Sequence, residues 1–318
     1  MAELGRRDFL GLCAGSAALA SCAGPGAPGL RAPVIDAHMH VWSDDPKRFP
    51  FSHPYTPGFQ APRAPGAVEA LLTEMDASGI DGCVLVQVIY HGWDNRYVAQ
   101  ALKAHPARFR VQGLIDPTDP ALARKLDDWV RGQGLSGMRF SPIYYEGRDQ
   151  WLNAPETRGL WEKARELGAI FNFFIATPQL PRLEERVRDF PDVPVVIDHL
   201  ARIDLKAVDP LPEFRRLLAL ARYPNVHAKV SELSVLSPSG TFPYADTHPW
   251  VRRLYDAFGP DRLLWGTGFP AGTRREAGRP SLAEELALIR SEIPFFTPAD
   301  RGKILGLNAA RLWKFPSA

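Results

Sequence analysis

Short apolar runs rich in β-forming residues recur eight times along the chain, and a segment with helical periodicity follows each of them. Strands that alternate with helices form right-handed βαβ units and a parallel sheet. The runs are apolar at nearly every position, as expected of strands that are covered on both faces. The expected strands are Val34 to His38, Cys83 to Val88, Arg110 to Ile115, Leu135 to Phe140, Ala169 to Ile175, Val193 to His199, Asn225 to Ser231 and Arg262 to Gly268.

The number of these units favours a closed barrel over an open sheet. A doubly wound open sheet would carry a Gly-x-Gly-x-x-Gly turn after its first strand, and this sequence has none there. Eight units over residues 34–318 suit a barrel, which usually needs roughly 250 residues. We therefore predict an α/β protein with a single domain, a (β/α)8 TIM barrel over residues 34–318. The expected helices are Ala67 to Ser78, Arg96 to Ala104, Pro120 to Arg131, Thr157 to Leu167, Gln179 to Phe190, Leu211 to Ala221, Pro249 to Phe258, Ser281 to Ile293 and Pro298 to Lys314.

Composition and charge exclude several classes of protein. The chain is 45% hydrophobic and 23% charged, which is ordinary for a globular domain and excludes disorder, collagen-like and coiled-coil folds. The 38 Lys and Arg residues nearly balance the 36 Asp and Glu residues and form no basic block. No nucleic-acid partner is therefore expected.

The first thirty residues are typical of an export signal. Arg6 and Arg7 precede an apolar stretch, Phe9 to Ala20, that is shorter than the roughly 20 residues of a membrane-spanning helix. The twin arginines resemble a twin-arginine export signal, and the sequence Leu19-Ala-Ser-Cys22 resembles a bacterial lipobox. The alternative is a signal that is cut at a small-residue site and carries no lipid.

Three segments follow from this interpretation. Residues 1–22 are predicted to form a twin-arginine signal peptide with a lipobox, in which Cys22 is the lipidation site. Residues 23–33, rich in Gly, Pro and Ala, are predicted to form a flexible tether. Acyl chains on Cys22 would hold the exported protein on a lipid bilayer, in the periplasm or at the cell surface.

Three histidines end two of the expected strands. His38 and His40 end the first strand, and its two-residue period turns both imidazoles to one side. His199 ends the sixth strand, where alternation is expected to turn Asp198 away from the lumen. Because strand ends converge on the barrel axis, the three histidines are candidate ligands of one divalent metal, with zinc preferred, and a metal-free site is the alternative. Histidines that merely form hydrogen bonds at the edge of the core would give the same pattern.

The chain carries five motifs in order, namely Ile35-Asp-Ala-His38-Met-His40-Val-Trp42, Gly137-Met-Arg139-Phe140, Ile197-Asp-His199-Leu200, Asn225-Val-His-Ala-Lys229-Val-Ser231 and Leu264-Trp-Gly-Thr267-Gly268-Phe269-Pro270. This set resembles the amidohydrolase-related family of the amidohydrolase superfamily. It is most similar to the branch that contains the sugar-acid lactonases and pyrone-dicarboxylate lactonase. The motifs extend over nearly the whole chain after the export signal.

The resemblance implies a barrel hydrolase in which an activated water attacks the carbonyl carbon of a small lactone, ester or amide. Metal-dependent members hold a zinc-like ion through the histidines of strand one, a later histidine and an aspartate of strand eight. Some lactonases of this branch work without a metal and polarise the carbonyl with histidines and basic residues. In both versions the aspartate of strand eight takes a proton from water.

Gly268 stands where the family carries that aspartate. Glycine can neither bind a metal nor accept a proton, so three interpretations stay open. The three histidines could still hold a metal that activates water. Another carboxylate, with Glu232, Asp246 and Glu146 as candidates, could replace the missing one. The chain could instead be a pseudoenzyme or ligand-binding barrel, or a decarboxylase-type relative.

Basic and aromatic residues near the strand ends are candidates for binding a small-molecule substrate. Arg139 and Lys229 match basic positions of the family motifs and suit a carboxylate or an oxyanion, although structural salt bridges would explain them equally well. His91, Trp42 and Tyr144 follow strand ends as candidate pocket residues. The long segment from Ser43 to Pro65 is expected to cover the mouth of the barrel. Together these features predict a hydrolase with His38, His40, His199 and Glu232 as its candidate catalytic residues.

Overall fold

The computed structural model describes residues 31–60, 62–268 and 270–316. Residues from Ala32 onward form one compact unit. The predicted signal peptide, the predicted lipidation site Cys22 and most of the predicted tether lie outside the described residues. Within the described part of the chain, no helix combines the length and the apolar character needed to cross a membrane.

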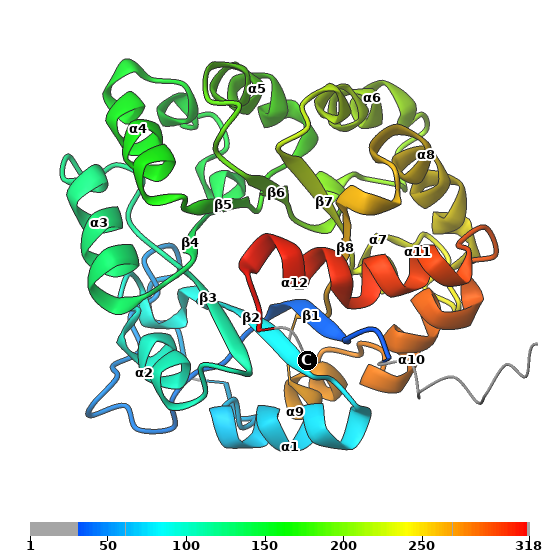
Figure 1. Ribbon diagram of the computed structural model, residues 1–318, viewed down its shortest axis with the longest axis horizontal. Coiled ribbons are helices and arrows are strands. Elements are labelled where there is room, and N and C mark those ends of the chain that lie inside the picture. The colour runs from blue at the N-terminus through cyan, green and yellow to red at the C-terminus, as the bar shows by residue number, and fades with distance from the viewer. Residues whose placement is uncertain (1–30, 61, 269, 317–318) are drawn as a thin grey trace, which may run out of the picture. The chain divides into compact units, whose positions relative to one another are not determined.

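Eight parallel strands follow one another around a barrel in the order of the sequence (Figure 1). A parallel bridge between Met39 and Gly268 joins the segment after the last strand to the first strand. The predicted (β/α)8 barrel is therefore confirmed. The strands are β1 (Ile35–Met39), β2 (Gly82–Val86), β3 (Phe109–Gly113), β4 (Gly137–Phe140), β5 (Ile170–Phe173), β6 (Val195–Ile197), β7 (Val226–Val230) and β8 (Leu263–Trp265).

Helices surround the strands and lie between them in sequence (Figure 1). The helical periodicity located most of them to within a few residues. Two short helices that follow β7 and β8, α7 and α9, were not predicted. The helices are α1 (Val68–Ser78), α2 (Arg96–Ala104), α3 (Leu122–Gln133), α4 (Arg158–Leu167), α5 (Leu180–Asp189), α6 (Leu211–Ala219), α7 (Leu233–Leu236), α8 (His248–Phe258), α9 (Ala271–Glu276), α10 (Leu282–Ala287), α11 (Pro298–Gly302) and α12 (Asn308–Trp313).

The last predicted helix, Pro298 to Lys314, is interrupted in the structure. A π-helical turn over Lys303–Leu307 separates α11 from α12. Gly306, inside this turn, lies so close to the start of the barrel that an added Cβ would fall 1.8 Å from the carbonyl oxygen of Pro33. Tight packing against the chain before β1 thus accompanies the wider turn, and sequence periodicity does not reveal such a contact.

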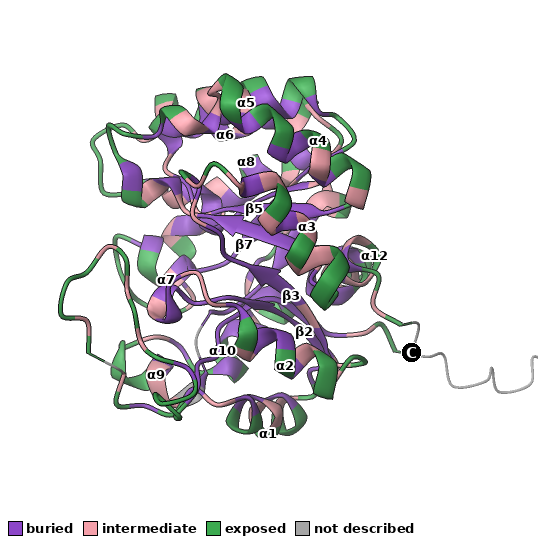
Figure 2. Cartoon of the chain, turned by 90° about the vertical axis from the view of Figure 1, so that its left-hand side faces the viewer, coloured by how far each residue is buried: buried purple, intermediate pink, exposed green. Residues whose placement is uncertain are grey.

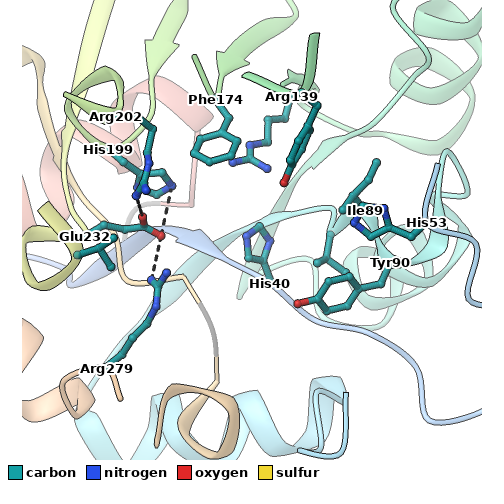
Figure 3. A pocket seen from close by; sticks show the side chains of 13 residues that line it. His40, His53, Ile89, Tyr90, Arg139, Phe174, His199, Arg202, Glu232 and Arg279 are labelled. Carbon is teal, nitrogen blue, oxygen red and sulfur yellow. Dashed lines mark hydrogen bonds and ion pairs between the residues drawn. The ribbon is translucent and has the colours of Figure 1, made fainter. Parts of the chain in front are cut away.

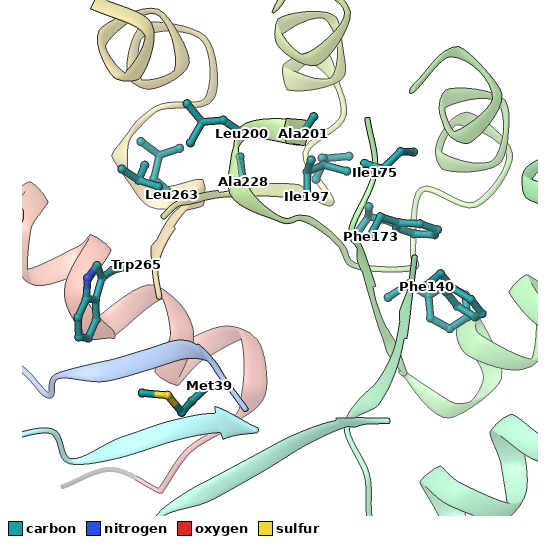
Figure 4. Packing of buried hydrophobic residues seen from close by; sticks show 14 of the residues in the cluster. Met39, Phe140, Phe173, Ile175, Ile197, Leu200, Ala201, Ala228, Leu263 and Trp265 are labelled. Carbon is teal, nitrogen blue, oxygen red and sulfur yellow. The ribbon is translucent and has the colours of Figure 1, made fainter. Parts of the chain in front are cut away.

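Alternate residues of the strands belong to two different apolar clusters. One set, which includes Phe140, Phe173 and Trp265, packs with buried residues of the surrounding helices (Figure 4). The other set, which includes Val84 and Leu264, packs with Trp313 of α12. The strands are buried on both faces as a result, which explains their nearly continuous apolar character (Figure 2).

Helix α12 covers the amino-terminal end of the barrel. Arg110, near the start of β3, donates a hydrogen bond from Nε to the carbonyl oxygen of Trp313 at 3.0 Å. The side chain of Phe315 lies next to Gly82, the first residue of β2. Barrel enzymes place their active sites at the opposite, carboxyl-terminal end of the strands.

The segment from Ser43 to Pro65 packs on the loops at the opposite end of the barrel. Tyr55 stacks on Tyr144 with ring centroids 4.7 Å apart, and Phe59 stacks on Tyr90 at the same distance. The hydroxyl of Tyr55 also donates a hydrogen bond to that of Tyr145 at 2.9 Å. The aromatic residues of this segment therefore form one wall at the mouth, as predicted.

Candidate active site

A cavity of about 240 Å³ lies at the carboxyl-terminal ends of the strands (Figure 3). Its wall is built mostly from turns that follow directly after strands, because these turns meet at one end of a parallel barrel. The residues that line it are His40, His53, Val88, Ile89, Tyr90, Arg139, Tyr144, Phe174, His199, Arg202, Glu232, Val235 and Arg279.

His38 and His40 of the β1 end aim the same ring nitrogen at one point. Nε2 of His38 lies 3.3 Å from Nε2 of His40. Two unprotonated nitrogens at this distance repel each other unless a proton or a cation lies between them. His40 donates a hydrogen bond from Nδ1 to the carbonyl oxygen of Val86 at 2.6 Å, which leaves the lone pair on Nε2. The pair thus presents at least one nitrogen lone pair to a shared partner.

Asp36 fixes the backbone that carries these histidines. The pairing of β1 with β2 shifts its register between Asp36 and Met39, and such an irregularity changes the direction of the side chains that follow. Asp36 Oδ1 accepts the backbone N–H of His38 at 2.8 Å, and Oδ2 accepts the hydroxyl of Thr267 at 2.6 Å. Burial raises the pKa of Asp36 to about 6, although the Thr267 hydrogen bond opposes this rise.

Asp198 lies within the site, and the prediction that it faces away from the lumen was wrong. The prediction assumed that β6 continues to His199, whereas the strand ends at Ile197. From His199 to Arg202 four consecutive residues adopt left-handed backbone angles, with φ between 50° and 52°. Because of this turn, the two-residue alternation of a strand does not predict the directions of Asp198 and His199, and His199 lines the cavity. Left-handed backbone angles in residues other than glycine are uncommon and are frequent at functional sites.

His199 is held between two neighbouring strand ends. Its Nδ1 lies 2.8 Å from the hydroxyl of Ser231, which follows β7. The ring centroid of His199 lies 4.5 Å from that of His38. The structure therefore brings together all three histidines that the sequence proposed as one site.

A buried ionic cluster lies behind the histidines. Nζ of Lys229 forms an ion pair with Asp198 Oδ1 at 2.9 Å and also lies 2.9 Å from Nδ1 of His38. Arg139 donates from Nε to the other oxygen of Asp198 at 3.0 Å, and its guanidinium lies over the ring of Phe174 at 4.5 Å. Burial would raise the pKa of Asp198, but Lys229 and His38 hold it well below its ordinary value. The carboxylate is therefore ionised and positions both cations.

The three imidazoles are neutral at ordinary pH. Burial lowers the pKa of His40 to about 3, and Arg139 acts in the same direction. Burial also lowers the pKa of His199 to about 4, against the attraction of nearby carboxylates. Burial and then Lys229 lower the pKa of His38 well below its ordinary value. Neutral imidazoles keep a lone pair that can accept a proton or bind a metal.

The donor set fits a divalent ion such as Zn²⁺, which favours imidazole nitrogen. Ligand atoms of His38, Asp198 and His199 all lie within 4.8 Å of one another. This cluster contains Asp198 where the sequence analysis had proposed His40. Both oxygens of Asp198 already bind cationic side chains, whereas His40 directs a lone pair toward His38. The cluster of possible metal ligands therefore consists of His38, Asp198 and His199, and His40 lies beside it with Nε2 3.3 Å from Nε2 of His38.

Glu232 is the predicted replacement carboxylate that reaches the cavity. It has a left-handed backbone conformation with φ 56° and is 8% exposed. Oε2 accepts a hydrogen bond from Arg202 at 2.8 Å, Oε1 accepts one from Arg279 at 2.9 Å, and Oε1 lies 3.9 Å from Nε2 of His199 (Figure 3). Burial alone would raise the pKa of Glu232, but His199 and the two arginines lower it to about 2.

The other two carboxylate candidates do not line the cavity. Asp246 accepts hydrogen bonds from the Ser237 hydroxyl at 2.7 and 2.9 Å and from the backbone N–H of Ser239 at 2.8 Å. It therefore fixes the loop that precedes α8. Glu146 is exposed after the turn that follows β4.

The predicted substrate-binding residues have separate positions. Arg139 and Tyr144 line the cavity, whereas Lys229 is fully buried behind it. Trp42 does not line it, because its indole packs so tightly against Gly66 that an added Cβ would lie 2.1 Å away. His91 also lies outside the cavity and fixes the loop at the mouth, since its Nε2 accepts the backbone N–H of Ser43 at 3.3 Å.

Sequence reasoning missed several residues of the site. Arg202 and Arg279 line the cavity, but neither belongs to a recognisable spacing, and Arg279 follows the last strand by fourteen residues. Phe174 directly follows β5, but the predicted strand continued to Ile175, so Phe174 fell inside the predicted strand and not after its end. Ser231, the last residue of the Lys229 motif, holds His199.

The fold and the site define a class of protein before any comparison is made. A (β/α)8 barrel with neutral histidines at its strand ends, beside a cavity lined by arginines, is the arrangement of a barrel hydrolase that acts on a carbonyl group.

Comparison with known proteins identifies the family within this class. Residues 35–315 match the family model described as amidohydrolase, so the chain belongs to the amidohydrolase family. The chain is 31% identical over 284 residues to the 4-sulfomuconolactone hydrolase of Rhizobium radiobacter, which covers 87% of this chain and 89% of that protein. It is 29% identical to the 2-pyrone-4,6-dicarboxylate hydrolase of Comamonas testosteroni, with 92% and 94% of the two chains covered.

A solved structure shows the same fold. A zinc-bound amidohydrolase from Burkholderia multivorans superposes with a TM-score of 0.71 at 24% identity and covers 90% of this chain and 100% of that chain. The predicted resemblance and the predicted hydrolase are confirmed by these comparisons, and they do not favour a barrel that only binds a ligand. The chain is a hydrolase of the amidohydrolase family.

Proposed function

We propose that this hydrolase opens a small lactone that carries two acid groups. The observation that carries the proposal is the charge of the cavity wall. Three arginines and one carboxylate line the cavity, which leaves a formal charge of +2 when the histidines are neutral. The buried pair of Lys229 and Asp198 behind the wall adds no net charge. Electrostatic complementarity favours a ligand of opposite charge, and a dianionic substrate supplies the two negative charges that balance this net charge.

The remaining wall suits a flat ring. Tyr90, Tyr144 and Phe174 line the cavity, and Ile89 adds apolar surface. Arg139 is held over Phe174 and by Asp198, so its planar guanidinium has a fixed direction in which to bind a carboxylate. The relatives support this substrate class, because one is named for a lactone that carries a sulfo group and another for a pyrone that carries two carboxylates.

The reaction is the addition of water to the carbonyl carbon of the lactone, followed by cleavage of the ring C–O bond. The proton that water loses finally resides on the oxygen that leaves the ring, and the product is an open-chain acid. In the metal-free form of the site, neutral His40 and His199 line the cavity and can hold that proton between the two steps.

Glu232 suits a different role in this scheme. A carboxylate whose pKa lies near 2 is a weak proton acceptor at neutral pH. Its hydrogen bonds instead fix the direction of Arg202 and Arg279, and its position 3.9 Å from His199 stabilises that imidazole when it carries a proton. We therefore propose Glu232 as a positioning residue.

We propose that His38, His40 and His199 hold one divalent ion, with zinc as the preferred metal. A bound divalent ion supplies Lewis acidity, which polarises a carbonyl oxygen and makes water more acidic. The 3.3 Å separation of the two Nε2 atoms and the zinc bound to the Burkholderia multivorans protein support this proposal. Asp36 and Val86 would hold the ligand histidines in place from behind.

Hydrolysis of paired substrates tests the proposed function. We expect the full-length protein to open 2-pyrone-4,6-dicarboxylate with a kcat/KM at least about 100-fold above that for unsubstituted 2-pyrone, because only the dicarboxylate balances the net positive charge of the cavity wall. Loss of the pyrone absorbance measures both reactions. Equal kcat/KM values for the two compounds would contradict the proposal that the substrate is a dianion. No turnover of any lactone, with or without added zinc, would overturn the proposed function.

We also propose that the protein is exported by the twin-arginine route and anchored to a membrane by acylated Cys22. The order of Arg6 and Arg7, the apolar stretch and the lipobox-like sequence supports this proposal. Replacement of Cys22 by Ser is expected to move the protein from the membrane fraction to the soluble fraction, because acyl chains supply the attachment. An unchanged distribution between the two fractions would exclude the anchor.

A further inference from the structure

His53 is the side chain that the segment from Ser43 to Pro65 presents to the cavity. Among the described residues of this segment, His53 alone lines the cavity wall. Its ring packs against that of Phe59 with centroids 5.0 Å apart, and its centroid lies 6.5 Å from that of Tyr90. These contacts hold the imidazole in a fixed plane at the mouth of the barrel.

One hydrogen bond decides which ring nitrogen of His53 carries the proton. Nδ1 accepts the backbone N–H of Tyr55 at 3.2 Å. A nitrogen that accepts a hydrogen bond uses its lone pair, so the proton of the neutral ring is on Nε2. Partial burial also lowers the pKa of His53, which favours the neutral ring. His53 is therefore an uncharged N–H donor.

This donor has no partner within the described part of the chain, where the bond with Tyr55 is the one hydrogen bond of the imidazole. Figure 3 shows His53 with Ile89 and Tyr90 on one side of the cavity, and Glu232 on the other. A ligand that fills the cavity displaces water from Nε2. The donor then keeps a hydrogen bond only when the ligand places an acceptor against it.

We propose that His53 is a specificity-determining residue that donates a hydrogen bond from Nε2 to an uncharged oxygen of the substrate. The inference rests on the proposed function and deepens it, because it adds a neutral contact to the charged ones. The acid groups of the substrate are drawn to the arginines of the wall, whose charge they balance. The acceptor left for His53 is the carbonyl oxygen or the ring oxygen of the lactone.

The alternative is that His53 only shapes its own segment through the bond with Tyr55. Two amide side chains separate these roles, because each of them replaces one ring nitrogen. The short asparagine places its amide oxygen near the position of Nδ1, where it accepts the N–H of Tyr55. The longer glutamine reaches the position of Nε2 and presents an N–H donor to the cavity. A donor to the substrate is thus kept by His53→Gln, and a support of the segment is kept by His53→Asn.

Two flat dicarboxylates that are not lactones test the proposal by titration calorimetry on the full-length protein. Isophthalate and 4-pyranone-2,6-dicarboxylate carry their carboxylates in the same relation on a six-membered ring, and only the pyranone has uncharged oxygens in and on that ring. We expect the wild type and His53→Gln to bind the pyranone about 5- to 10-fold more tightly than isophthalate, the effect of one neutral hydrogen bond. In His53→Asn and His53→Phe the ratio of the two affinities is expected to fall to about one.

The control makes the same replacement at a histidine away from the cavity. His105 precedes β3, at the amino-terminal end of the barrel, and His105→Asn is expected to leave the ratio unchanged. Binding of these ligands involves no hydrolysis. A protein that shows the expected ratios but opens no lactone would therefore disprove the proposed function and keep the role of His53.

Three results would overturn the proposal. The first is a wild type that binds the pyranone no more tightly than isophthalate, even when it opens the dicarboxylate pyrone. The second is the reverse order of the amide variants, in which His53→Asn keeps the preference and His53→Gln loses it. The third is a full preference in His53→Phe, which has a ring of similar size and no donor.

Discussion

The double variant His38→Ala/His40→Ala is expected to lose at least about 10³-fold in kcat/KM and about one equivalent of bound divalent metal. The physical reason is that the Nε2 atoms of the two histidines lie 3.3 Å apart and are both proposed metal ligands, and the double variant removes both. Elemental analysis of purified wild type and variant measures the metal, and the pyrone assay measures the rate.

A histidine elsewhere in the fold provides the control for this variant. His105 caps the end of α2 and packs against Phe109, so His105→Ala is expected to keep both the metal and the rate. Retention of the full metal content by the double variant would exclude these residues as ligands. Metal-free wild type that is fully active would leave the histidines with proton transfer alone.

The sequence was sufficient for the fold because its signal is repeated. Eight apolar runs and the helices between them each contribute weak evidence, and all of them agree on one architecture. The C-terminal helix has no such repeated signal. A single contact of Gly306 with Pro33 accompanies a π-helical turn inside a helix that the periodicity predicted as continuous. Local packing of this kind has no periodic signature.

The candidate site was predictable only where it follows strand geometry. His38, His40 and Arg139 lie at strand ends, and the motifs that carry them are local. His199 and Asp198 were proposed on the assumption of a strand that continues, and the left-handed turn after Ile197 placed Asp198 inside the site. Backbone angles of this kind are set by tertiary packing and are not encoded in a period of two.

The net positive charge of the cavity wall could not be predicted from the sequence for a different reason. Arg202 and Arg279 are two of many arginines in the chain, and each lies on an irregular segment. Their role becomes visible only when Glu232 is seen to accept a hydrogen bond from both.

Lys229→Met is expected to lower the free energy of unfolding by about 3–5 kcal/mol. Lys229 is fully buried, and its ammonium is the closest partner of Asp198 Oδ1 at 2.9 Å. Without it the buried carboxylate keeps Arg139 on its other oxygen and the more distant Nδ1 of His38, at 3.6 Å. Midpoints of unfolding in guanidinium chloride measure the loss. Lys303→Met provides the control, because Lys303 pairs with Asp261 at the surface and is expected to cost less than about 1 kcal/mol.

A double-mutant cycle distinguishes a charge effect from a loss of packing. Asp198→Asn removes the charge that Lys229 balances, so the double variant Asp198→Asn/Lys229→Met is expected to be more stable than the sum of the two single losses predicts, by about 1–3 kcal/mol. Strict additivity would mean that Lys229 contributes mainly its aliphatic chain. Coupling in this cycle would show that the charge of Lys229, whose Nζ also lies 2.9 Å from Nδ1 of His38, stabilises the barrel through Asp198.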